Sequence, residues 1–255
     1  MPVREIAAAL DIGEIREEPL TNFEAALITT PERGYGSILV NLNSSRRRRR
    51  YSIGHELLHF LNPWHRPTSP GGFECSRLDM IETGSHDRDL HRRQEAEANT
   101  FAIELLAPAE RVRGYMADTP DLAEVIAMAD DLDISREAAA RRYVSLHDEG
   151  LTVLFVDNGL LRYSRSGTRF PRLCIDDGRS VPAISLGPAA RTLSSIEEVD
   201  PEDWLRHSDG ILLWAQILHQ RNGFATILLR ASGTDDEDDP DIDDAFERLT
   251  DLGAR

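Results

Sequence analysis

The sequence predicts an α+β fold, because helical and strand-like patterns fall in different parts of the chain. Between residues 46 and 148 several segments repeat apolar residues every three to four positions, which is the spacing of amphipathic helices. After residue 150 the pattern changes to strands joined by Asp-Asn-Gly and Asn-Gly turns, which is typical of β-hairpins. We therefore expect a helix-containing N-terminal part followed by a β-rich C-terminal region.

The N-terminal elements are expected to be short. Residues 1–20 indicate a short helix and then a loop, and residues 23–29 and 37–41 are strand-like on either side of a turn with Pro and Gly. These strands predict a small antiparallel sheet. A helix should cover the HELLH motif of residues 55–59. Residues 62–90, rich in Pro, Gly, Ser and charge, should form a long surface excursion.

The rest of the chain divides into recognisable segments. A helix is predicted from about residue 91 to 107, where Pro108 stops it. Two amphipathic helices follow, with Ser135 as N-cap of the second, and the pair resembles a helix-turn-helix. The predicted organisation comprises a first domain, a helix-turn-helix-like segment, a β-rich domain with two hairpins, and an acidic tail, at residues 1–120, 121–149, 150–233 and 234–255.

Composition excludes several classes of protein. The net charge of −16 argues against a general binder of nucleic-acid phosphates, and the acidic tail, expected to be solvated, supplies half of it. No apolar run approaches the ~18 residues of a membrane span, and the N-terminus lacks a secretory core, so we expect a cytoplasmic location. Cys75 and Cys174 provide no disulfide framework. Cys75 follows the HELLH helix and keeps a chance of a local role there.

The HELLH motif carries the residues that most directly suggest chemistry. On a helix with about 100° per residue, His55 and His59 lie about 40° apart and one turn from each other, so both imidazoles can bind one zinc ion. Glu56 is rotated by about 100° from His55, where it is free to act on a water molecule as a base. The apolar residues lie on the other side, so the histidines are expected to face a cleft.

A zinc site needs a third protein ligand, and two candidates compete. His65 stands ten residues after His55, which is the spacing of HExxHxxGxxH metalloproteases, but Asn62 replaces the glycine at which that chain turns back. Glu95 is the alternative, because it falls on the apolar, packing face of its helix. A buried carboxylate needs a partner, either a metal ion or an arginine such as one of residues 46–50.

Two segments of the chain form a paired motif, RRRRYSIGHELLHFL and EAEANTFAIELLAP. The pair resembles the ImmA/IrrE metallopeptidases, in which an Arg-rich lead-in and an HExxH helix precede an E-x-x-A-N-x-F-A-x-x-L-L-x-P helix. The resemblance covers residues 20–110 well and the helical pair more loosely. It implies a zincin-like metallopeptidase domain in which one zinc ion is bound by His55, His59 and Glu95, with Glu56 as the catalytic base.

The resemblance also implies a function. ImmA/IrrE proteins cleave helix-turn-helix repressors to switch on stress or mobile-element genes, so it implies a zinc-dependent endopeptidase whose substrate is a repressor on a separate chain. The alternative is a catalytically silent module that senses or sequesters a regulator, as in toxin–antitoxin or mobile-element pairs. The intact Glu56 favours the enzyme. Two departures concern packing near the metal: Gly54 replaces the usual alanine, and Leu58 replaces the usual glycine.

Three other segments have expected roles. We expect the arginine run of residues 46–50 to be solvated or to pair with the protein's own acids, with positioning of an acidic stretch of substrate as the alternative. The helical pair carries Asp130, Asp131 and Asp133, which phosphates would repel, so we expect it to support or dock a substrate and not to bind DNA. The strand at residues 37–41 is expected to align the substrate by edge pairing.

Further polar residues are candidates for supporting roles. Asn99 and His91 flank Glu95 on the same side of its helix and are expected to contact the ligands. Histidines and tyrosines that the sequence does not rank are His86, Tyr51, Tyr143 and Tyr163.

Overall fold

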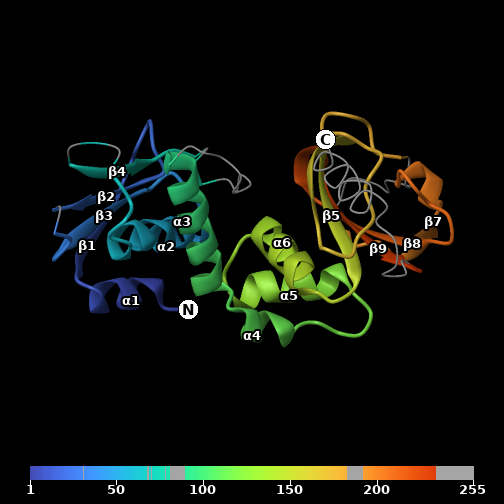
Figure 1. The fold of residues 1–255 in the computed structure, drawn as a ribbon, viewed down its shortest axis with the longest axis horizontal. Coiled ribbons are helices and arrows are strands. Elements are labelled where there is room, and N and C mark those ends of the chain that lie inside the picture. The colour runs from blue at the N-terminus through green and yellow to red at the C-terminus, as the bar shows by residue number, and fades with distance from the viewer. Residues whose placement is uncertain are drawn as a thin grey trace, which may run out of the picture.

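The computed structural model describes residues 1–30, 32–67, 69, 71–77, 79–80, 90–182 and 192–233. Its elements form two lobes, each built around a sheet, with a group of helices between them (Figure 1). The first lobe combines helices with a four-stranded sheet, and the second is built on a five-stranded sheet. The predicted α+β class with a β-rich C-terminal region is therefore confirmed.

The sheet of the first lobe is mixed, with the strand order β1-β3-β2-β4. Its pairing of β1 with β3 is parallel, whereas β2 is antiparallel to both β3 and β4. The two predicted strands are present as β2 and β3, but the prediction of a purely antiparallel sheet was wrong. The strands are β1 (Ile12–Glu18), β2 (Ala25–Thr29), β3 (Gly36–Asn41) and β4 (Gly72–Cys75).

Three predictions for this lobe were wrong. Residues 12–18, predicted as a loop, form β1, because parallel pairing with β3 supplies hydrogen bonds that no local pattern reveals. The expected excursion of residues 62–90 contains β4, so part of it is buried in the sheet. Edge pairing of a substrate with residues 37–41 is excluded because β3 lies between β1 and β2, and the edge strands of this sheet are β1 and β4.

Helices α1 (Val3–Ala9) and α2 (Arg46–Leu61) pack on this sheet, and α3 (Leu90–Leu106) packs on α2. Ser45 caps α2 by accepting a hydrogen bond from the backbone N–H of Arg48, which satisfies a donor of the first turn. Ile53 and Leu57 have no exposed surface and belong to the cluster that includes the sheet. α2 contacts β2 and β3 on one side and α3 on another. The two predicted motif helices are thus neighbours.

The helical group between the lobes contains α4 (Ala109–Arg113), α5 (Leu122–Asp131) and α6 (Arg136–Leu146). The hydroxyl of Ser135 accepts from the N–H of Ala138, so the predicted N-cap is confirmed. Val125, Met128 and Tyr143 are buried in the same cluster as the first sheet. The apolar faces of α5 and α6 therefore pack inside the protein.

The second sheet has the order β6-β5-β9-β8-β7 and contains both predicted hairpins, β5 with β6 and β8 with β9. Asn158 and Asn222 have positive φ angles of 50° and 60°, which their Asn-Gly turns require. Two short 3-10 helices, η1 (Pro201–Asp203) and η2 (Arg221–Gly223), adjoin the strands. The strands are β5 (Gly150–Asp157), β6 (Leu160–Ser166), β7 (Glu197–Val199), β8 (Leu212–His219) and β9 (Phe224–Ser232).

The domain boundaries stay predictions. The change from helices to strands falls at residue 150, but the first hydrophobic cluster continues across it through Leu151 and Val153. A second cluster, around Trp204, covers the other face of this sheet. Residues 234–255 and His86 lie outside the described residues. No helix in the described part of the chain combines the length and apolar character that crossing a bilayer requires.

Candidate metal centre

Helix α2 carries His55 and His59 into the interior of the first lobe. Their Nε2 atoms are 3.2 Å apart, as the i,i+4 spacing predicts. Neither side chain has exposed surface. Both rings are covered because α3 packs along α2 and the ring of Phe73, from β4, stacks on His59 with 4.6 Å between ring centroids, and the predicted cleft beside them stays a prediction.

Helix α3 brings Glu95 to the two histidines. Its Oε2 lies 3.0 Å from Nε2 of His55, and its Oε1 lies 3.4 Å from Nε2 of His59. The two helices approach closely at Gly54, where a Cβ would lie 3.4 Å from Cα of Ala102. The structure therefore brings together the three residues predicted as zinc ligands, from two helices. Their role as ligands stays a prediction.

Hydrogen bonds around Asn99 define the protonation of His55. Oδ1 of Asn99 accepts from the Tyr51 hydroxyl at 2.9 Å and lies 3.0 Å from Nδ1 of His55, while its Nδ2 donates to the Asp79 carbonyl. This network places the proton of neutral His55 on Nδ1. Nε2 then directs a lone pair at the Glu95 carboxylate, and two acceptors at that distance repel unless a cation lies between them. The arrangement therefore calls for a proton or a metal ion.

The protonation states and spacing fit zinc. Burial lowers the pKa of His59 to about 4, so its imidazole is neutral near pH 7. Burial alone would raise the pKa of Glu95, but without a metal ion the hydrogen bonds that share a proton between its carboxylate and the two histidines outweigh burial and lower this pKa to about 2. Neutral imidazole and ionised carboxylate are the forms that bind zinc. Around a tetrahedral zinc with bonds of about 2.0–2.1 Å, neighbouring ligand atoms lie roughly 3.3–3.4 Å apart.

Glu56 lies beside this group and has no exposed surface. Neither of its carboxylate oxygens has a hydrogen bond of normal geometry within the described residues. Burial raises the pKa of Glu56 well above its ordinary value, the thiol of Cys75 opposes this shift, and the charge of Glu95 adds to it. A buried carboxyl without partners is costly. Such a group with a raised pKa is typical of a proton carrier in an active site.

The sequence left open a local role for Cys75 near the HELLH helix, and the structure places its sulfur beside the donor atoms. Its sulfur and one donor atom each of His55, His59 and Glu95 all lie within 4.8 Å of one another, and all four residues are buried. Burial raises the pKa of the Cys75 thiol well above its ordinary value, and the charges of Glu56 and Glu95 add to the shift. No spacing rule signals this contact, because Cys75 comes from a short strand that the sequence pattern does not reveal.

His65 lies behind His59 and outside the donor group. Its Nδ1 is 2.9 Å from Nδ1 of His59, on the side of that ring away from Glu95, and its Nε2 lies 3.0 Å from Oε2 of Glu97. Asn62 has φ −90° and ψ 104°, which is extended backbone and not the left-handed turn that the local motif needs. The structure thus favours Glu95 over His65 as the third ligand.

The expected supporting residues make the expected contacts. Oδ1 of Asn99 lies 3.0 Å from Nδ1 of His55. Nδ1 of His91 lies 3.6 Å from Oε1 of Glu95, and its Nε2 lies 3.3 Å from the Asp79 carboxylate. Two other candidates, Tyr143 and Tyr163, lie away from the donor group. The Tyr143 hydroxyl donates to Glu124 of α5, and the Tyr163 hydroxyl donates to Glu137 of α6.

The arginine run at the start of α2 pairs with the protein's own acids, as expected. A carboxylate oxygen of Asp133 lies 2.5 Å from Arg46, and the other lies 2.8 Å from Arg50. Arg47 reaches Asp130 at 2.7 Å. These contacts tie α2 to the end of α5 and to the turn before α6, and they offset the charge of two of the three acids that disfavoured DNA binding, Asp130 and Asp133.

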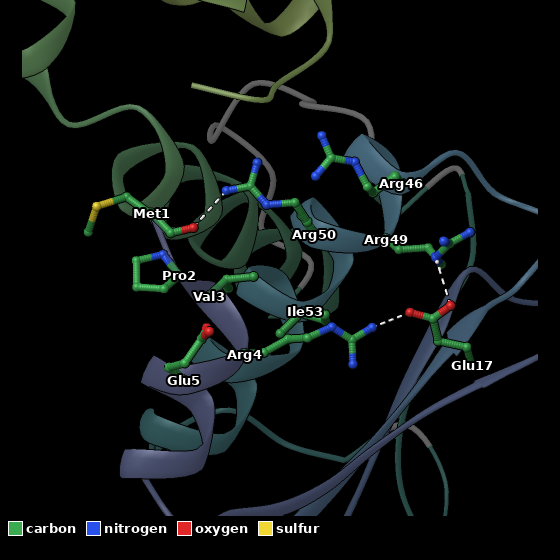
Figure 2. Close-up of a pocket in the computed structure, with 10 residues that line it drawn as sticks. All are labelled: Met1, Pro2, Val3, Arg4, Glu5, Glu17, Arg46, Arg49, Arg50 and Ile53. Carbon is green, nitrogen blue, oxygen red and sulfur yellow. Dashed lines mark hydrogen bonds and ion pairs between the residues drawn. The ribbon is translucent and has the colours of Figure 1, made fainter. Parts of the chain in front are cut away.

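A small cavity of about 290 Å³ lies along the same arginines (Figure 2). Figure 2 shows Arg4 and Arg49 converging on Glu17, and Arg50 donating to the carbonyl of Met1 at 2.7 Å. None of the four donor residues lines this cavity. It therefore belongs to the packing of α1 and β1 against α2 and not to the metal centre.

A larger cavity of about 940 Å³ lies between α2, α3, α6 and β6. Tyr51, which bonds to Asn99, and Met80, whose sulfur accepts from Ser52, form part of its wall next to the donor group. Its described lining residues include seven arginines and two glutamates. This cavity is therefore lined by an excess of basic residues, although the protein as a whole is acidic.

Comparison with known proteins matches this geometry to a family. The family model Peptidase_M78, the IrrE N-terminal-like domain, matches residues 13–143, just over half of the chain. The match includes the first sheet, both site helices and the helical pair, so the zincin-like peptidase domain expected in this part is confirmed. A search of curated proteins found no match.

Proposed function

Because the chain belongs to the IrrE N-terminal-like peptidase family (Peptidase_M78), we propose that it is a zinc-dependent endopeptidase acting on a protein substrate. One observation carries the proposal. The side chains of His55, His59 and Glu95 converge in a buried site, and Glu56 stands beside them with no hydrogen bond of normal geometry to its carboxyl among the described residues. Metal ligands with an adjacent carboxylate that takes a proton from water and passes it on are what hydrolysis of a peptide bond requires.

In this proposal each residue has a defined task. When bound, zinc supplies Lewis-acid polarisation of a carbonyl and makes water acidic enough to lose a proton near neutral pH. His55, His59 and Glu95 hold the ion, and Asn99 keeps His55 in the tautomer that leaves Nε2 free. Glu56 accepts the proton of the attacking water and delivers it to the leaving amine. Its raised pKa allows it to carry the proton between these two steps.

The substrate is expected to be a helix-turn-helix repressor on a separate chain, cleaved in stress response or mobile-element regulation. β4 is an edge strand whose residue Cys75 reaches the donor group, so its free edge is a better place for an extended substrate segment than β3. The basic cavity beside the centre suits an acidic stretch of that substrate. We expect this reaction to take place in the cytoplasm, where such regulators bind DNA.

The second candidate function is a catalytically silent module that binds a regulator without cleaving it. Cys75 favours it, because a thiol near the position that a catalytic zinc keeps open could close the centre. The two candidate functions differ in the role of Glu56, because a module that does not cleave its partner does not require a catalytic base.

Cleavage by a Glu56→Gln variant separates the two functions. The zinc-loaded protein is incubated with the helix-turn-helix regulator encoded beside its gene, and fragments are identified by mass spectrometry. The wild type and the surface control Glu110→Gln should cut the regulator, while Glu56→Gln should bind zinc and leave the regulator intact. Equal cutting by Glu56→Gln would refute the base role, and regulator binding without cutting by the wild type would favour the silent module.

A further inference from the structure

A fourth potential metal ligand stands at the proposed zinc centre. The sulfur of Cys75 lies within 4.8 Å of the donor atoms of His55, His59 and Glu95, and all four side chains are buried. Around a tetrahedral zinc with bonds of about 2.1 Å to nitrogen and 2.3 Å to sulfur, ligand atoms lie roughly 3.5 Å apart.

The first sheet fixes the direction of Cys75. In the β2–β4 pairing Cys75 lies opposite Ala25, and Phe73 lies opposite Leu27. Because side chains alternate along a strand, Phe73 and Cys75 share a face, and Phe73 is the ring that stacks on His59. The carbonyl of Cys75 also accepts from the N–H of Glu24 at 2.9 Å. The sulfur therefore points to the donor group because of the backbone pairing and not by a chance rotamer.

A second observation marks the same place as a ligand position. Glu56 has no exposed surface, and the Cys75 thiol is its polar neighbour, but neither of its oxygens has a hydrogen bond of normal geometry within the described residues. Oε1 of Glu95 is also without one. Two buried carboxyl groups and a thiol thus face one another, and no arginine makes an ion pair with Glu56 or Glu95 among the described residues. A cation is what this group lacks.

We propose that Cys75 is a fourth protein ligand that closes the resting metal centre of this chain. The inference rests on the proposed zinc-binding function of His55, His59 and Glu95. Coordination replaces the S–H bond of Cys75 by a sulfur–metal bond, and the proton leaves to solvent. Catalytic zinc sites keep one position open for water or substrate, whereas sites with four protein ligands are closed. The resting protein is therefore latent.

Release of Cys75 opens the centre. β4 has four residues and pairs with the rest of the sheet only through β2. A substrate segment that displaces β4 from β2 therefore moves the thiol away from the metal. The sulfur then regains a proton from solvent, and the freed position becomes available. In this way substrate binding and activation of the centre are one event.

Cobalt substitution tests the fourth ligand directly. Metal-free full-length protein is titrated with Co²⁺ and its absorption spectrum recorded. The wild type should show visible bands of tetrahedral cobalt and a near-ultraviolet thiolate-to-cobalt charge-transfer band. Cys75→Ser should keep the visible bands and lose the charge-transfer band. The control Cys174→Ser should match the wild type, because Cys174 is exposed.

Zinc-edge X-ray absorption of the wild type provides a second measurement that needs no variant. It should show one sulfur neighbour at about 2.3 Å together with nitrogen or oxygen neighbours. Bound metal with no sulfur neighbour and no charge-transfer band would overturn the role of Cys75 while leaving the proposed function intact. Failure of the wild type to bind Co²⁺ or Zn²⁺ at all would instead refute the proposed function. If Cys75→Ser does not fold, the absorption edge of the wild type alone decides.

Discussion

Replacing Gly54 by alanine should stabilise the protein. Gly54 lies in the middle of α2 at its closest approach to α3, and an added Cβ would meet Cα and Cβ of Ala102 at 3.4 and 3.5 Å and Leu105 at 3.6 Å. These are ordinary van der Waals distances, so the methyl group fits. Removing a glycine from a helix interior gains about 1 kcal/mol. A gain of that size should raise the melting temperature by roughly 2–4 °C in a chain of this size.

Thermal unfolding followed by circular dichroism on metal-free protein measures this gain. Gly72→Ala serves as a control of opposite sign, because Gly72 has φ 145° and a Cβ there would lie 1.9 Å from the carbonyl oxygen of Leu27. That variant should melt below the wild type. Zinc binding by Gly54→Ala should be unchanged, since the helix spacing is preserved. A lower melting temperature for Gly54→Ala would show that α2 and α3 leave no room for a methyl group at this position.

Two further predictions concern the residues that position the site. Asn99→Ala removes the acceptor for Nδ1 of His55, so zinc affinity measured by chelator competition should fall roughly 10- to 100-fold, and an unchanged affinity would contradict its role. Arg50→Ala removes a largely buried side chain, 14% exposed, whose guanidinium contacts Asp133 and the carbonyls of Leu132 and Met1, so urea unfolding should show a loss of roughly 1–3 kcal/mol. Arg46→Ala, whose side chain is 73% exposed, should lose less than about 1 kcal/mol, and equal losses would refute this distinction.

The sequence predicted best the elements whose signals are local. Asn-Gly turns set the two hairpins of the second sheet, Pro108 ended α3, and Ser135 capped α6. β1 and β4 escaped prediction because their existence depends on pairing partners far along the chain. The same reason explains why β3 was expected at an edge: strand order is a non-local property that periodicity does not encode.

At the candidate site, too, the sequence predicted the local features and missed those that depend on pairing with distant parts of the chain. The i,i+4 spacing placed His55 and His59 together, and the helical face of Glu95 pointed it inward, where the structure has it. Cys75 and Phe73 reach the centre only through the register of β4 on β2, which no short pattern reports. Burial was also underestimated, because a helical wheel describes one helix and not the elements that cover it.

Zinc analysis of purified protein tests the central claim most directly. After dialysis against a weak chelator, mass spectrometry of the metal content should give about one zinc per chain for the wild type. Glu97→Ala, which changes a half-exposed carboxylate on the same helix, should match the wild type. Glu95→Ala should retain little zinc, because the carboxylate from α3 completes the site. A full zinc content in Glu95→Ala would show that the centre does not span the two helices.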